Sequence, residues 1–212
     1  MKKKLSEILA PMSFSEKRAY LWEYYKIHLL VSIVIIALII ATATSFGDKK
    51  DVVLNLVVMG ESVDSLSLES LKETMNSELL TEDESKDYTV SVRSIQYSSG
   101  QMDMHSSVGL QKMAAEVATK SIDIFVVEKA LFEQLNNDGQ LLPFEEISGI
   151  DLSSFNESEL YSSALKEDQV IGFNPAGMKI FENVIYNDDF VLCIPGNTEN
   201  LQRISQFFEI IS

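Results

Sequence analysis

A run of twenty residues near the start of the chain carries no charged side chain. Residues 27–46 read IHLLVSIVIIALIIATATSF, without Lys, Arg, Asp or Glu. At about 1.5 Å per residue, a helix of this length spans the ~30 Å hydrocarbon core of a bilayer. A buried core helix is the alternative, although such a helix usually carries a polar stripe. The pattern predicts a transmembrane helix over residues 27–46, between a cytoplasmic basic amphipathic segment, residues 1–26, and an extracellular domain, residues 47–212.

A cleaved signal peptide is the other interpretation of this run. Ala41-Thr42-Ala43 fits the small-x-small pattern of a cleavage site. The preceding basic region is long, and Ser13 to Glu16 (SFSE) has the spacing of a capping box that opens a helix. These features favour a retained anchor, and cleavage at Ala43 stays open.

Beyond the span, short apolar runs alternate with segments of helical spacing. The predicted strands are residues 51–60, 88–95, 122–127, 169–173 and 190–195. The predicted helices are residues 66–80, 108–117, 131–135 with an end at Gly139, and 197–211 with Asn197 or Thr198 as cap. Residues 145–166 are predicted to be loop with short helical turns. Strands alternating with helices predict an α/β fold with one parallel or mixed sheet.

Charge is divided unequally between the two sides of the span. Residues 1–26 contain six Lys or Arg against three Glu, whereas residues 48–212 contain eleven Lys or Arg against 29 Asp or Glu. The positive-inside tendency then predicts a single-pass cell-membrane protein with a cytoplasmic N-terminus. Tyr20, Trp22, Tyr24 and Tyr25 precede the span, where aromatic rings favour the headgroup level. The net charge of −15 argues against a nucleic-acid partner.

Two later segments carry a resemblance to a known family. Residues 121–147 (SIDIFVVEKALFEQLNNDGQLLPFEEI) and 190–211 (FVLCIPGNTENLQRISQFFEII) resemble stretches of bacterial extracellular solute-binding proteins. In the first, Asp123, Phe125, Gly139 and Pro143 match the family pattern, and Phe144 stands where Leu is usual. The resemblance implies an α/β domain like one lobe of a periplasmic-binding-protein fold. KRAYLWEYYKIHLL, residues 17–30, is similar to uncharacterised single-pass membrane proteins of Gram-positive bacteria.

The chain also departs from that family. Its members have two lobes that clamp the ligand between them, and here there is chain for one lobe. Gram-positive members usually carry a lipobox Cys, whereas the single Cys of this chain, Cys193, lies in an apolar strand. A single lobe cannot close over a ligand, which puts solute binding in question.

The residues that carry chemistry are few. No nucleophile elbow, HExxH motif or phosphate-binding glycine loop occurs, so we expect no enzyme activity and no cofactor. His105 follows Asp103, and a surface position is the favoured interpretation. Residues 134–145 place Gly139 and Glu145 where a calcium loop has its glycine and last acid. Gln134 replaces the first acid, however, and a helix end capped at Gly139 is favoured, so we expect no metal site.

Three functions remain from the sequence. The favoured one is a non-catalytic domain that docks on a partner protein of the membrane or cell surface, such as a transporter. The alternative is a solute-binding protein for an uptake system, with a small molecule or peptide at the carboxyl ends of the strands. A hydrolase-type enzyme is the least favoured. The candidate ligand-binding residues follow three predicted strands and are Gly60, Glu61, Ser62, Glu128, Lys129 and Asn174.

Overall fold

The structure is a computed structural model of the whole chain. It describes residues 10–46, 50–61, 63–98, 104–185 and 189–211. The chain forms two units, residues 1–49 and residues 50–212, and each is described by itself.

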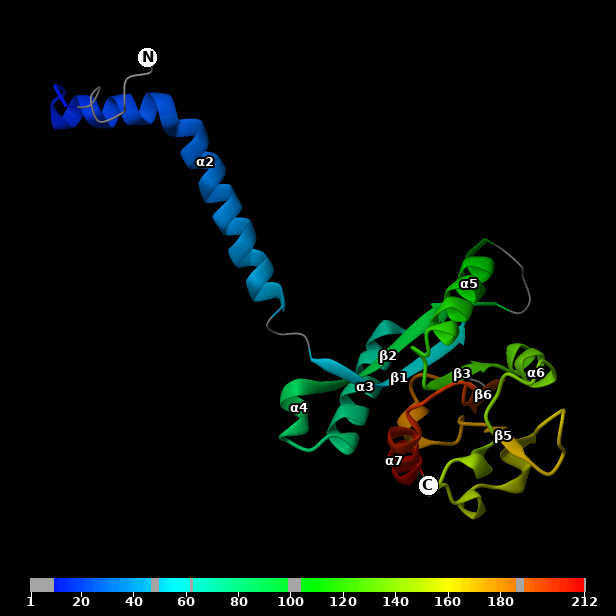
Figure 1. Cartoon of the computed structure of the whole chain (residues 1–212). Helices are drawn as coiled ribbons and strands as arrows, with labels where there is room; N and C mark the ends of the chain where they lie inside the picture. Colours follow the sequence, from blue (N-terminus) through cyan, green and yellow to red (C-terminus); the bar gives the residue numbers. More distant parts are fainter. Residues whose placement is uncertain (1–9, 47–49, 62, 99–103, 186–188, 212) are drawn as a thin grey trace. The chain divides into compact units, whose positions relative to one another are not determined.

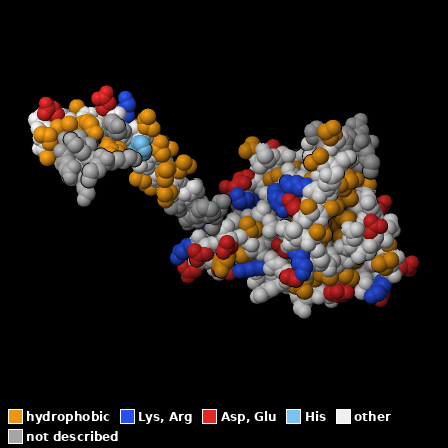
Figure 2. Space-filling view, turned by 45° about the horizontal axis from the view of Figure 1, so that its top comes forward, with side chains coloured by type: hydrophobic (Ala, Val, Ile, Leu, Met, Phe, Trp, Pro, Cys, Tyr) orange, Lys and Arg blue, Asp and Glu red, His pale blue; other side chains and the backbone are white. Residues whose placement is uncertain are grey.

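The first unit is built on one long helix, α2 (Phe14–Phe46). The expected capping box opens it: the Ser13 N–H and Oγ each donate to Glu16 Oε2 at 2.8 Å. The segment Tyr25–Thr42 of this helix is long and apolar enough to cross a membrane, and none of its residues is buried in the protein. Charged side chains gather on the preceding part of the helix (Figure 2). By length and composition, α2 therefore fits a membrane span or a signal sequence.

The second unit contains one six-stranded sheet among the described residues (Figure 1). Its strands are β1 (Asp51–Gly60), β2 (Tyr88–Gln96), β3 (Ile124–Glu128), β4 (Leu160–Ser162), β5 (Val170–Phe173) and β6 (Phe190–Cys193). They follow the order β2-β1-β3-β6-β5-β4. β1 is parallel to β2 and β3, whereas β6 is antiparallel to both β3 and β5. The predicted mixed α/β sheet is confirmed.

Helices cover both faces of this sheet. They are α3 (Ser65–Leu79), α4 (Glu84–Asp87), α5 (Met104–Ala118), α6 (Lys129–Asn137) and α7 (Leu201–Ile211). Alternate residues of β1 point to opposite layers: Leu54, Leu56 and Val58 join one core, and Val57 and Met59 join the other. The first core also contains buried side chains of α3 and α7, and the second contains those of α5 and α6. Burial on both faces explains the nearly continuous apolar sequence of β1.

The segment after β3 and α6 is irregular, as expected. It contains the short turns η1 (Phe144–Glu146), η2 (Leu152–Ser154) and η3 (Glu157–Glu159), and η4 (Lys179–Phe181) follows β5. The sequence missed β4, a three-residue strand at the edge of the sheet. The expected helix end at Gly139 is confirmed by its positive φ of 66°.

The predicted start of the last helix is wrong. α7 begins at Leu201 and not at Asn197, because the polar residues before it bind other segments. Asn197 Nδ2 donates to the Val117 carbonyl at 2.6 Å, and Thr198 Oγ1 donates to Asp123 Oδ1 at 3.1 Å. Neither side chain is the cap of α7.

Glu84 connects two helices of the domain. It begins α4 and accepts hydrogen bonds from the Thr81 N–H at 3.0 Å and Thr81 Oγ1 at 2.9 Å. Arg203 of α7 donates to its other oxygen at 2.6 Å. These hydrogen bonds, the one from Arg203 first, lower the pKa of Glu84 to about 2. The carboxylate therefore links α4 to α7 throughout the neutral range.

Asp123, just before β3, is a buried carboxylate with an exposed fraction of 6%. Its Oδ2 accepts from the Asn55 N–H of β1 at 2.8 Å and from Asn200 Nδ2 at 3.4 Å, and its Oδ1 accepts from Thr198. The Asp123 N–H donates to the Asn55 carbonyl at 3.0 Å. Burial raises the pKa of Asp123, and these hydrogen bonds oppose that rise. The carboxylate joins β1, β3 and the segment that leads into α7.

We expect Asp123→Ala to lower the free energy of unfolding of residues 48–212 by about 2–3 kcal/mol, because buried donors lose their acceptor. Asp64→Ala is the matched control: Asp64 caps α3 by accepting from the Ser67 N–H at 2.9 Å, and its loss costs about 1 kcal/mol. Urea unfolding of the two variants measures both values. Equal losses would contradict the role given to Asp123.

Candidate functional site

The carboxyl ends of four strands lie at one edge of the sheet. β1, β2 and β3 are parallel, and β5 runs in the same direction because β6 is antiparallel to both of its neighbours. The described candidate residues after β1, β3 and β5 therefore follow strands that end at this edge. The register places Glu128 opposite Phe190, with β6 standing between β3 and β5. In an open α/β sheet, this is the edge at which ligands bind.

The space beside Gly60 is filled by the protein itself. A Cβ added at Gly60 would come within 2.8 Å of the Phe190 ring, the first residue of β6. Glu61 is exposed, and Ser62 lies outside the described residues. Gly60 thus serves close packing between β1 and the Phe190 ring.

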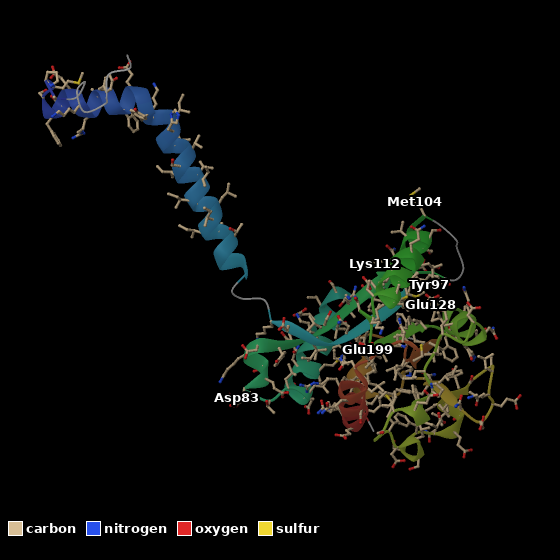
Figure 3. The ribbon with its side chains drawn as sticks, viewed as in Figure 1. Asp83, Tyr97, Met104, Lys112, Glu128 and Glu199 are labelled. Atoms are coloured by element: carbon tan, nitrogen blue, oxygen red, sulfur yellow. The ribbon has the colours of Figure 1, made fainter. Side chains whose placement is uncertain are left out.

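Glu128 and Lys129 have partners across the same edge. The pKa of Tyr97 is raised, first by burial and second by the negative charge of Glu128. Lys129 Nζ lies 5.5 Å from the centre of the Tyr161 ring, a cation–π distance. The Lys129 N–H donates to the Asp189 carbonyl at 2.7 Å. Tyr97 and Glu128 are labelled in Figure 3.

Tyr97 was missed by the sequence reasoning. It directly follows β2, and its N–H donates to the Gly60 carbonyl at 3.2 Å. Its position immediately after a predicted strand was the signal that could have found it. Asn174, by contrast, shapes its own turn: its Oδ1 accepts from the Ala176 N–H at 2.9 Å.

The first turns of α5 bring apolar side chains to this edge. α5 follows β2, and Ser106 Oγ accepts from the Ser98 N–H at 3.2 Å. Gly109 allows the helix to lie against β2, because a Cβ there would stand 2.3 Å from the Gln96 carbonyl oxygen. Met104 is 80% exposed and Val108, one turn later, is 58% exposed. We call Met104 and Val108 the α5 apolar pair; Figure 3 labels Met104 at the start of the helix.

A groove of about 640 Å³ lies elsewhere, between α3 and the segment around η4. Ser67, Ser70 and Thr74 line it from α3, and Lys179 and Asn183 line it from the η4 side. Glu78 lies at its wall, and Ile210 and Ile211 close it from α7. The groove therefore offers hydroxyl and amide groups together with one positive and one negative charge. None of the six candidate ligand-binding residues predicted from the sequence lines this groove.

The residues weighed for metal or nucleophilic chemistry have structural partners. In residues 134–145, which resemble a calcium loop but were expected to hold no metal, the Glu145 carboxylate accepts from the Val170 N–H at 2.9 Å, and Asn136 Oδ1 accepts from the Ala164 N–H at 2.7 Å. Within the described part of the chain, no three His, Cys, Asp or Glu side chains form a metal-binding group. Cys193 is buried, and burial raises the pKa of its thiol. The side chain of His105 lies outside the described residues.

Comparison with known proteins gives one structural likeness. No family model matches the chain, and no curated protein matches it. Among solved structures, the extracellular solute-binding protein family 1 from Alicyclobacillus acidocaldarius subsp. acidocaldarius DSM 446 is similar with a TM-score of 0.40 and 18% sequence identity. The match covers 60% of this chain and 29% of that protein, so the chain spans less than a third of its length.

Proposed function

We propose that this protein is a membrane-anchored, non-catalytic domain that docks on a partner protein at the outer face of the cell membrane. The observation that carries the proposal is the α5 apolar pair, which is exposed at the sheet edge where α/β domains bind their ligands. Other exposed apolar side chains of the domain lie elsewhere, such as Leu66 on α3 and Leu165 in the loop between β4 and β5.

The anchor follows from the composition and exposure of α2. The segment Tyr25–Thr42 is predominantly apolar, and none of its residues is buried in the protein, so lipid is the environment that suits it. The excess of Lys and Arg before the span supports a cytoplasmic N-terminus. The domain of residues 50–212 then lies outside, where its excess of acidic residues keeps it soluble.

The surroundings of the candidate binding residues favour a protein partner over a small solute at this edge. The Phe190 ring fills the space beside Gly60, and Asn174 is engaged in its own turn. Lys129 lies against the Tyr161 ring. The α5 apolar pair is exposed, and apolar anchors of this kind dominate the energetics of protein interfaces.

A photo-crosslinking amino acid at Gln111, an exposed position of α5, tests docking in the native membrane with the full chain. We expect a discrete crosslinked species of constant mass, reduced at least about fivefold by Met104→Asp because a docking anchor contributes more than 1 kcal/mol. The control is Leu66→Asp, which places the same charge at a side chain that is 79% exposed on α3. Equal crosslinking in the two variants would overturn the proposal.

Solute binding is the second candidate, and the groove beside α3 favours it. Its volume of about 640 Å³ lies within the range of ligand sites, about 300–1,000 Å³. Lys179 and Glu78 would meet a carboxylate and an ammonium group, and the hydroxyls of α3 would meet further polar atoms. An amino acid or a short peptide is the ligand class that this lining suits.

For this second candidate, a saturating amino acid or dipeptide should raise the melting temperature of the protein. At a hundred times the dissociation constant the ligand adds about 2.7 kcal/mol, which corresponds to roughly 5–11 °C. Lys179→Met should abolish the shift, whereas Lys166→Met, outside the groove, should leave it intact. A shift that survives Lys179→Met, or no shift with any of these compounds, would exclude the groove as their site.

A further inference from the structure

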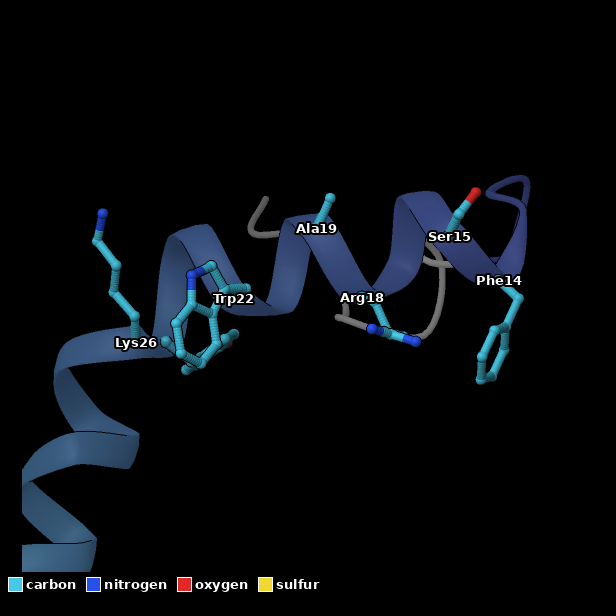
Figure 4. A pocket seen from close by; sticks show the side chains of 7 residues that line it. Phe14, Ser15, Arg18, Ala19, Trp22 and Lys26 are labelled. Carbon is cyan, nitrogen blue, oxygen red and sulfur yellow. The ribbon is translucent and has the colours of Figure 1, made fainter.

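The part of α2 before the apolar span forms an angle with it. Figure 4 shows the helix turning just after Lys26, where the charged sequence meets the uncharged run. A hollow beside this turn is lined by Phe14, Ser15, Arg18, Ala19, Trp22, Tyr25 and Lys26. Phe14 is 78% exposed and Trp22 is 66% exposed, so both rings present their surface to the surroundings of the helix.

Phe14 and Trp22 lie on a different face of this part of the helix from its two acidic side chains, whereas Tyr20 lies on the acidic face. Phe14, Arg18 and Trp22 follow one another at intervals of four residues and therefore share one face. Glu16 and Glu23 are seven residues apart and share another face, roughly 140–160° around the helix from Arg18 at 100° per residue. The segment is amphipathic, with one cation between two rings on its apolar face.

The direction of the turn relates this apolar face to the span. In Figure 4, Phe14 and Arg18 extend to the side toward which the helix turns, and the Trp22 ring lies in front of the ribbon and reaches to that side. Ser15, Ala19 and Lys26 extend to the other side. When the span enters a bilayer, that apolar side therefore faces the membrane surface. Glu16 and Glu23 then face the water, away from the lipid phosphates.

We propose that residues 14–26 lie on the membrane surface and bind anionic phospholipid headgroups. Arg18 contacts the phosphates, and Phe14 and Trp22 enter the boundary between headgroups and acyl chains. Charge complementarity supports this occupant, because residues 14–26 carry a net charge of +1, the sequence before them adds Lys2, Lys3 and Lys4 against Glu7, and the cytoplasmic leaflet is anionic. The proposal is also supported by the position of residues 14–26, because they belong to the same helix, α2, as the apolar segment Tyr25–Thr42. The proposal rests on the membrane anchor of the proposed function and not on partner docking.

Trp22 is the sole tryptophan of the chain and reports directly on this contact. The full chain is reconstituted in phosphatidylcholine vesicles and in vesicles with phosphatidylglycerol as about a third of the lipid. Phospholipids brominated at successive acyl positions then quench its fluorescence. We expect the strongest quenching from the shallowest bromine position, and stronger quenching in the anionic vesicles.

Paired substitutions separate specific contact from general charge. Arg18→Gln should lower the ratio of surface-bound to free segment about fivefold in the anionic vesicles, the factor that corresponds to ~1 kcal/mol per basic residue. Lys17→Gln removes the same charge from a neighbour outside the hollow and should have the smaller effect. If the protein floats with the vesicles but the brominated lipids do not quench Trp22, the surface contact of residues 14–26 is overturned and the membrane anchor is not. Protein that fails to float with the vesicles would overturn the anchor itself.

Quenching that is equal in the neutral and anionic vesicles would overturn the headgroup contact of Arg18.

Discussion

The buried carboxylate of Asp123 is the constraint on which the arrangement of the sheet depends. It stands just before β3, accepts from the backbone of β1, and binds Thr198 and Asn200 ahead of α7. These segments are far apart in the sequence and come from both layers of the fold. A buried carboxylate without such partners would be strongly destabilising, so it holds all of them in one arrangement. The result is a fixed register between β1 and β3 at the start of the parallel part of the sheet.

That register determines what gathers at the opposite edge. β1, β2 and β3 run in one direction, so Gly60, Tyr97 and Glu128 meet where they end. Gly109 allows α5 to lie close to β2. The α5 apolar pair, in the first turns of this helix, is exposed. The candidate docking surface is thus a consequence of strand direction and of one close helix–strand approach.

The sequence predicted the elements whose signal is local. The apolar run of β1 is strong because the strand is buried along most of its length, and the helical spacing of α3 is strong because one face of the helix, with Leu68, Leu71, Met75 and Leu79, is buried. β4 was missed because three half-exposed residues carry no periodicity. The start of α7 was wrong because Asn197 and Thr198, good local caps, bind Val117 and Asp123 instead. For the site, strand direction predicted the shared edge, but Phe190 beside Gly60 is a long-range contact that no local pattern shows.

The central claim is that α2 anchors an outer α/β domain, and thiol labelling of the full chain in intact cells tests it most directly. Cys193 is buried with a raised pKa, so it gives no background. A membrane-impermeant maleimide should label Gln111→Cys in intact cells, and Ser15→Cys only after permeabilisation. The labelled protein should remain with the membrane. Labelling of Ser15→Cys but not Gln111→Cys in intact cells, or labelled protein free in the medium, would contradict the account.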